Sequence, residues 1–240
     1  SYFWAWMDIK CRYRRSALGP FWETVNMTIM ILGMAFVSGA LFNVPIKEML
    51  PFLGLGIIFW SVIANSINEG ASCFISHSNL LKNSNSSIGF YVGRTILRVY
   101  ITAAHHLVIY ILAVIFLNVD INANTLLGIP GIFLLFLNSL WIAPTLGFIC
   151  ARYRDFEMIV RNITQLLFFV TPIFWNPDIV SSDKRIIIDL NPFYYFLEIV
   201  RAPLLGKTPS LQVYLVVLLM TFTGYLIFSV IYKIMRSRLV

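Results

Sequence analysis

The densest group of ionisable side chains in this 240-residue chain lies near its start, in the segment DIKCRYRRSALG. The basic members are Lys10, Arg12, Arg14 and Arg15. A guanidinium group presents a planar fork of N–H donors that matches a phosphate, so this cluster is a candidate contact for a phosphate-bearing substrate. The same composition, preceded by aromatic and apolar residues, also suits a helix that anchors the chain in the membrane interface. Both interpretations remain open from the residues.

The adjacent His105 and His106 lie inside an apolar segment, where an ionisable residue is a functional candidate by default. Neighbouring positions on a helix point about 100° apart, so the two rings cannot hold one metal ion from one face. We therefore expect neutral histidines that are hydrogen-bonded between helices.

The acidic residues are scattered. None of the 11 lies near the middle of an apolar segment, with Glu23, Glu69 and Glu157 at segment ends. A proton-coupled carrier needs carboxylates within the membrane, and an enzyme acting on lipid-linked sugars needs grouped acids or His/Asp pairs. We therefore expect no catalytic residue and no metal site.

The segment RAPLLGKT (201–208) ends like a phosphate-binding loop. Arg201 replaces the first glycine of that motif, Pro203 lies inside it, and no strand precedes it. We expect this chain to bind neither ATP nor magnesium and to carry no cofactor of its own.

Composition places these residues in a membrane protein. Hydrophobic residues make up 59% of the chain and charged residues 12%, against about 25% charged in soluble domains. Apolar segments of about 18 residues or more, long enough to cross the hydrocarbon core as helices, recur along the sequence. The expected spans are 24–42, 51–69, 98–117, 126–150, 157–175 and 211–232. The predicted fold is an all-α polytopic membrane protein with six transmembrane helices.

The basic residues indicate the orientation. Of the 18 lysines and arginines, 13 flank one set of span ends, which the positive-inside rule assigns to the cytoplasm. Both termini are then cytoplasmic. The net charge of +7 is explained by this bias and by attraction to anionic lipid, so we expect no nucleic-acid partner.

Three regions are not expected to span the membrane. Residues 1–20 predict an amphipathic helix at the interface. Residues 70–97 form the longest cytoplasmic connection, between spans 24–69 and spans 98–175, and its length favours a short helix that docks on another protein. Residues 176–210, on the external side, contain RIIIDL and FYYFLEIV, which are too short to span and indicate re-entrant half-helices, with Glu198 and Arg201 paired on one face. Span 211–232 and a cytoplasmic tail, 233–240, complete a single transmembrane domain.

Aromatic residues are abundant, with 20 Phe, 11 Tyr and 6 Trp. Many lie near span ends, where interfacial anchoring explains them. Others lie inside spans and are candidates to line a path along which sugar rings slide. These are Trp60, Trp141, Phe168, Phe169, Phe174 and Trp175. The alternative for each is ordinary packing between helices.

Three stretches together resemble the permease subunit of type-2 ABC exporters, and within that family the branch that exports O-antigen, capsule or teichoic acid. They are DIKCRYRRSALGPFW (8–22), ARYRDFEMIVRNITQLLFFVTPIFW (151–175) and LNPFYYFLEIVRAPLLG (190–206). The resemblance implies a homodimer in the bacterial inner membrane whose interface forms a channel. A separate ABC ATPase subunit would bind ATP and magnesium, and the substrate would be a glycan on undecaprenyl diphosphate.

The resemblance also assigns roles to residues. The N-terminal helix would gate the cytoplasmic entrance, with its basic cluster contacting the lipid diphosphate. A coupling helix between spans two and three would dock on the ATPase through Asn79, Leu80, Leu81, Lys82 and Asn83. An external gate would include Phe193, Tyr194, Tyr195, Glu198 and Arg201. The alternatives are an exporter of a lipid or drug, a membrane enzyme that processes lipid-linked sugars, and an ion-coupled flippase.

Overall fold

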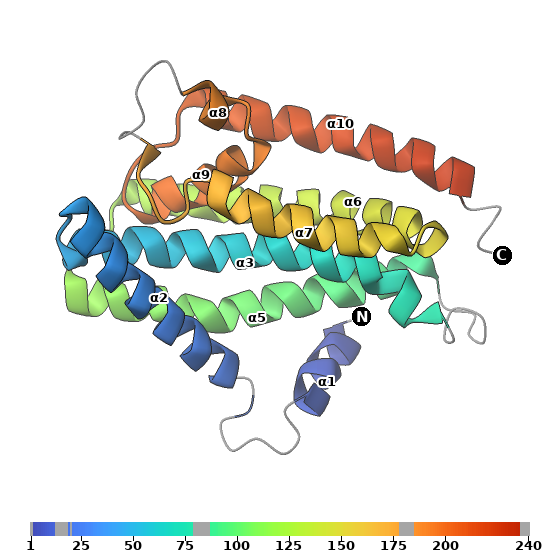
Figure 1. Ribbon diagram of the computed structural model, residues 1–240, viewed down its shortest axis with the longest axis horizontal. Coiled ribbons are helices and arrows are strands. Elements are labelled where there is room, and N and C mark those ends of the chain that lie inside the picture. The colour runs from blue at the N-terminus through green and yellow to red at the C-terminus, as the bar shows by residue number, and fades with distance from the viewer. Residues whose placement is uncertain (1, 13–18, 20, 79–86, 178–184, 236–240) are drawn as a thin grey trace.

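The computed structural model is an elongated bundle of helices (Figure 1), and it describes residues 2–12, 19, 21–78, 87–177 and 185–235. All regular elements within those ranges are helical, in agreement with the predicted all-α class. The order is α1 (Tyr2–Arg12), α2 (Phe21–Phe42), α3 (Ile46–Ser76), α5 (Ile88–Leu117), the 3-10 helix η1 (Ala123–Leu127), α6 (Gly128–Arg152), α7 (Asp155–Val170), α8 (Ile186–Asp189), α9 (Pro192–Leu204) and α10 (Leu211–Met235).

Five helical segments are long and apolar enough to cross a membrane, which confirms a polytopic membrane protein. They are α2, α3, α5, η1 with α6, and α10. Two of them extend furthest beyond the expected spans, since α3 continues to Ser76 and α5 already begins at Ile88. Most of the region expected to connect spans two and three is therefore a continuation of two helices. Glu69, expected at a span end, lies within α3.

The fifth expected span, 157–175, differs from the structure. Its helix, α7, ends at Val170, and Thr171–Trp175 is not helical. Thr171 has an extended backbone (φ −82°, ψ 136°) because it precedes Pro172, and a proline disfavours the helical conformation of the residue before it. The 16-residue helix is shorter than the length typical of a full crossing. Six spans thus stay a prediction.

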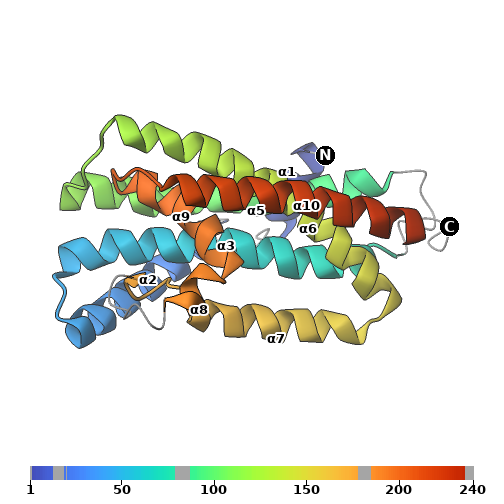
Figure 2. The ribbon, with the colours of Figure 1, turned by 90° about the horizontal axis from the view of Figure 1, so that it is seen from above.

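The long helix α3 forms the centre of the bundle. It packs against α2, α5, α6, α7 and α9. Of the residues in its most apolar 18-residue stretch, 72% are buried. Figure 2 shows it between α7 on one side and α5 and α10 on the other. Helices α3 and α6 approach most closely at Gly70, where an added Cβ would lie 2.5 Å from the Cα of Ala143. Close contact through small residues is the usual way to pack helices in lipid.

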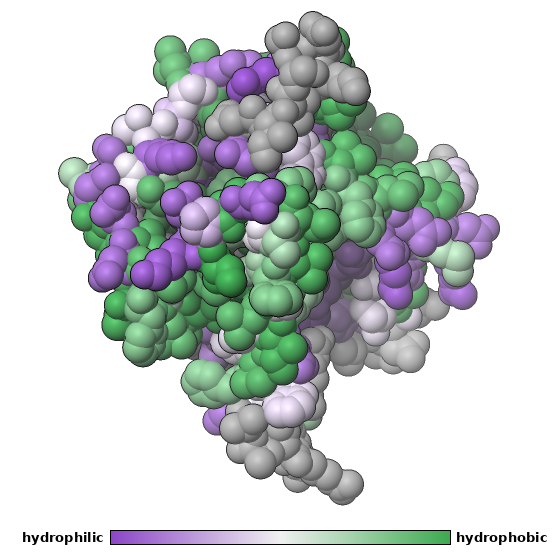
Figure 3. Space-filling view, turned by 60° about the vertical axis from the view of Figure 1, so that its left-hand side comes forward, coloured by the Kyte–Doolittle hydropathy of each residue, from purple (hydrophilic) through white to green (hydrophobic). Residues whose placement is uncertain are grey.

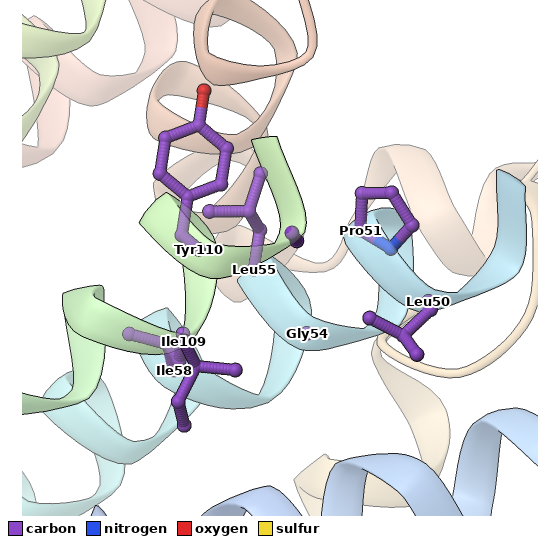
Figure 4. A pocket seen from close by; sticks show the side chains of 8 residues that line it. Leu50, Pro51, Gly54, Leu55, Ile58, Ile109 and Tyr110 are labelled. Carbon is purple, nitrogen blue, oxygen red and sulfur yellow. The ribbon is translucent and has the colours of Figure 1, made fainter. Parts of the chain in front are cut away.

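Packing between α3 and α5 leaves one small apolar cavity, of about 10 Å³ (Figure 4). Leu50, Pro51, Gly54 and Leu55 line it from α3. Tyr110 stands beside it, and its hydroxyl donates to the carbonyl of Leu204, 2.6 Å away, in α9. A cavity of this size and polarity is too small and too apolar to hold a ligand.

The region 176–210 contains the two short helices predicted for it, α8 and α9. They are separated at Asn191, whose side-chain oxygen accepts a hydrogen bond from the backbone N–H of Phe193 (3.0 Å). Pro192 then occupies the first turn of α9, where its missing N–H costs nothing. The N-cap at Asn191 and the proline after it therefore set this break.

The outer surface is largely apolar. Figure 3 shows apolar side chains covering much of one face, between patches of hydrophilic residues. On α10, Leu215, Leu219 and Phe222 are each more than half exposed, with exposed fractions of 58%, 62% and 66%. A face of this kind suits contact with lipid hydrocarbon.

Candidate functional site

The N-terminal helix α1 docks on α5 through a network of ion pairs. The guanidinium of Arg94 donates to both carboxylate oxygens of Asp8, with Nε 2.7 Å from Oδ2. Arg98, one turn along α5, donates to Asp8 at 3.5 Å and to Glu69 of α3 at 2.7 Å. The network therefore joins three helices, and its four side chains are between 16% and 26% exposed.

Burial and charge act in opposite directions on Asp8. Burial raises the pKa of its carboxyl, but the hydrogen bond from Arg94 and the charges of Arg94 and Arg98 outweigh that effect. The pKa of Asp8 therefore lies below its ordinary value, and the carboxylate is ionised at neutral pH.

Aromatic side chains reinforce the same contact. Arg94 lies over the ring of Trp4, 5.6 Å from its centroid. His105 of α5 is stacked on Trp6 at 6.3 Å and meets Phe21 edge-on at 5.6 Å. Helix α1 thus rests on protein along α5, in addition to whatever contact it makes with lipid.

A polar cavity of about 350 Å³ lies beside this network, between α2, α3 and α5. Its polar lining is Glu23 and Asn26 from α2, Asn65 and Glu69 from α3, and Arg98, Thr102 and His106 from α5. Met27, Met30 and Val99 supply its apolar wall. Asn26 and Asn65 are exposed, so the cavity is open to the surface. Polar groups of this kind inside a helical bundle mark a water-filled or ligand-binding space.

The two histidines differ from expectation. Nδ1 of His105 is 2.7 Å from the carbonyl of Ile101, within its own helix rather than between helices. His106 is 4% exposed, and neither of its ring nitrogens has a hydrogen-bond partner within the part of the chain that the structure describes. The prediction of histidines bonded between helices is wrong for both residues.

The basic cluster predicted to contact a phosphate is only partly described. Lys10 is exposed on α1, with its Nζ 5.9 Å from the ring centroid of Trp6. Arg12 is the last residue of α1, whereas Arg14 and Arg15 lie outside the described residues. Phosphate contact stays a prediction for all four.

The network of Asp8, Glu69, Arg94 and Arg98 was not predicted from the sequence. Both arginines belong to the basic residues that were counted for membrane orientation. A signal was present, because the two arginines are one turn apart on a single helix face, while Asp8 and Glu69 are among the few acids at that end of the bundle.

The six candidate aromatics do not form one surface. The ring of Trp60 in α3 contacts Phe168 of α7 and Phe193 of α9 edge-on, with ring centroids 6.0 and 5.9 Å apart. Phe168 in turn contacts the rings of Phe169 and Phe174. Trp60 is itself only 6% exposed, so it belongs to the core.

Trp141 lies elsewhere, between α6 and α10. Its Nε1 donates to Asn138 at 2.8 Å, and its ring covers Gly224, where an added Cβ would overlap it. Trp175, the last candidate, is half-buried in the non-helical segment after α7. A channel role for these aromatics stays a prediction.

The predicted pair of Glu198 and Arg201 is confirmed at 2.8 Å. Arg201 is only 1% exposed, and it also donates to the carbonyl of Pro172 at 2.7 Å and lies over the ring of Phe52, 4.1 Å from its centroid. Arg201 therefore ties α9 to the segment after α7 and to α3.

The other residues assigned to an external gate surround this pair on α9. Tyr195 is buried and donates to the carbonyl of Asp189 at 2.9 Å, whereas Phe193 and Tyr194 are half-buried. The structure thus brings together the five residues predicted for a gate, without testing the gating itself. Asn79, Leu80, Leu81, Lys82 and Asn83, predicted to dock an ATPase, lie outside the described residues.

Helix α7 carries polar residues on its outer face. Asn162 and Gln165 are exposed near its middle, and Arg161 is paired with Glu157 at 3.1 Å. Amide side chains facing hydrocarbon are unfavourable, because lipid offers them no hydrogen-bond partner. This face of α7 therefore suits a water-filled path or a second polypeptide.

Known proteins resemble the chain over most of its length. The family model described as "ABC-2 type transporter" matches residues 3–205. The "O-antigen export system permease protein RfbA" of Klebsiella pneumoniae is 25% identical over 192 residues, which cover 77% of this chain and 72% of that protein. The protein of the same name from Myxococcus xanthus is 25% identical over 195 residues, with coverage of 77% and 72%.

Proposed function

The chain belongs to the ABC-2 type transporter family, and we propose that it is the membrane subunit of an ATP-driven exporter of a lipid-linked polysaccharide. The observation that carries this proposal is the similarity, over 77% of the chain, to proteins named as O-antigen export permeases. The glycan would be linked to undecaprenyl diphosphate and would move from the cytoplasm to the periplasm.

Two copies of the chain would enclose the path. A glycan carries many hydroxyl groups, each of which costs several kcal/mol if it enters hydrocarbon unpaired, by general estimates. A water-filled channel removes that cost. Two separate places support contact with water: the exposed amides Asn162 and Gln165 on α7, and the polar cavity between α2, α3 and α5. The aromatics around Phe168 would form an apolar stretch of the same wall.

The energy would come from a separate ABC ATPase that docks near 79–83, between α3 and α5. In the chain this segment lies between the end of α3 and the start of α5, so movement of the ATPase would be transmitted to α3, the spanning helix with the largest buried share. With six spans, both termini would lie in the cytoplasm. The basic residues after Lys10 would then meet the lipid diphosphate at the cytoplasmic surface.

Export is the decisive test. Cells lacking the chain should lose surface polysaccharide and regain it on complementation, and the purified chain should carry an ABC ATPase with it. Stable assembly after replacing 79–87 with Gly and Ser would exclude that docking site. Reversing the charges at Arg12, Arg14 and Arg15 together should impair export while the complex still assembles. Surface polysaccharide that is unchanged in cells without the chain would overturn the proposed function.

A further inference from the structure

The polar cavity between α2, α3 and α5 is not explained by helix packing. Its volume of about 350 Å³ compares with the ~300–1,000 Å³ typical of small-molecule pockets. His106 forms part of its wall while being 4% exposed and without a partner for either ring nitrogen among the described residues. The ring nitrogens of His106 are themselves enclosed, so the polar side chains that a ligand can reach are the exposed Asn26 and Asn65 and the half-buried Thr102. Hydrogen-bonding side chains that face an open space rather than a neighbouring helix point to a ligand in that space.

The charges of the lining restrict what that ligand is. Arg98 is already bound by Glu69 and Asp8, so the cavity offers no surplus positive charge for a phosphate. Two carboxylates, Glu23 and Glu69, would repel an anion. A cation is also disfavoured, because the carboxylate of Glu69 is already paired with Arg98. The site therefore suits a neutral ligand.

The remaining lining matches hydroxyl groups. A hydroxyl both donates and accepts hydrogen bonds. Carboxylates accept, the amides Asn26 and Asn65 do both, and Thr102 adds a hydroxyl. Met27, Met30 and Val99 offer an apolar wall for the C–H face of a ring. A sugar ring has this combination of polar rim and apolar faces.

We propose that this cavity binds one neutral sugar unit within a single subunit, and that the unit belongs to the exported glycan. The inference rests on the proposed function for the source of the sugar. The site lies next to the Asp8–Arg94 contact, and Arg98 belongs to both. A sugar bound there would contact Arg98, which also pairs with Asp8 of α1. Binding of the glycan would therefore be coupled to the contact that holds the N-terminal helix in place.

The test separates binding from export. The full chain is purified in lipid nanodiscs with the subunits that remain bound. Methyl glycosides of glucose, galactose, mannose and rhamnose are then examined by saturation-transfer NMR, with pyrophosphate as the anionic probe. We expect at least one glycoside to give a signal that Asn65→Leu lowers at least fivefold. Asn68→Leu, on the same helix but outside the cavity lining, should keep the signal within twofold of wild type.

Three results would overturn the proposal: no glycoside signal, a signal equal in Asn65→Leu and wild type, or displacement of the glycoside by pyrophosphate. Thr102→Val removes one hydroxyl at nearly constant volume and replaces Asn65→Leu if that variant does not fold. Export is measured in parallel, and Asn65→Leu should lower surface polysaccharide at least threefold. Lost glycoside binding with unchanged export would refute the link to the glycan, whereas failure of the proposed function would appear as normal export in cells without the chain.

Discussion

Asp8 in the first helix and Arg94 in α5 are joined by two hydrogen bonds although 86 residues separate them in sequence. The pair makes α1 part of the folded bundle. Because Arg98 links the same carboxylate to Glu69 on α3, the position of α1 depends on α3 and α5, two of the three helices that enclose the polar cavity. The N-terminal helix and the cavity are therefore one structural unit.

Removing the charge of Asp8 should release α1. Asp8→Asn leaves Arg94 without its carboxylate, and an ion pair of intermediate burial is worth about 1–3 kcal/mol, between the values for exposed and buried pairs. We expect amide hydrogen exchange to accelerate at least fivefold across α1 while the central part of α3 keeps its protection. Glu157→Gln breaks an exposed pair on α7 and should change neither region. Unchanged exchange in α1 would show that its aromatic contacts suffice.

The same contact should be insensitive to pH around neutrality. The pKa of Asp8 is lowered in the folded chain, so the stability that its ionisation contributes is complete above the pKa of a free carboxyl, about 3.9. It is lost as pH falls through the lower folded pKa. Exchange in α1, corrected for its intrinsic pH dependence, should therefore be constant from about pH 8 to pH 5. A loss of protection near pH 6 would mean that a histidine controls the docking.

Replacing Arg201 with a residue that lacks its charge or its length should lower the stability of the folded chain. Arg201→Met leaves the buried carbonyl of Pro172 and the half-buried carboxylate of Glu198 without their donor, and breaking a buried pair costs up to about 3–5 kcal/mol. The melting temperature of Arg201→Met in detergent should be several degrees lower than that of the wild type, or the variant should fail to accumulate in cells.

Arg201→Lys is the matched variant, since it keeps the charge but replaces a planar fork with a point charge. We expect an intermediate loss. If Arg201→Met melted at the same temperature as the wild type, a structural role for this network would be contradicted.

Packing of α3 on α6 should fail when Gly70 gains a side chain. In Gly70→Ala the new Cβ would lie 2.5 Å from the Cα of Ala143, which is backbone and cannot rotate away. The helices must separate, at a cost of about 1–3 kcal/mol. Gly33→Ala is the control, because nothing lies within 4 Å of its Cβ position and alanine favours the helix. Equal melting temperatures for the two variants would refute this close approach.

The two exposed amides of α7, Asn162 and Gln165, should be reached by water. In a background without the native cysteines, Asn162→Cys and Gln165→Cys should react with a small water-soluble maleimide in membranes. Leu219→Cys, on the apolar face of α10, should react at least tenfold more slowly because thiolate does not form in hydrocarbon. Equal protection of all three cysteines would indicate that lipid covers this face of α7.

Local features of this protein follow from the sequence. The helices, the break at Asn191 and Pro192 and the pairing of Glu198 with Arg201 all depend on residues within about one turn of each other. The end of α7 could also be predicted from the sequence, since Pro172 disfavours a helical conformation at Thr171. The apolar segments also determine that the chain is a membrane protein, because hydropathy reports on the solvent of a helix.

Only the tertiary structure decided which helix faces meet. The rotation of each helix about its axis is set by packing with its neighbours. This packing brought Asp8 to Arg94 and left the ring nitrogens of His106 without a hydrogen-bond partner among the described residues. It also placed Trp141 between α6 and α10 and Trp60 against α7, although the sequence shows both as aromatic residues in the middle of a span. A sequence gives each helix its residues in order, but the side chains that share a site come from several helices and are fixed only when those helices pack.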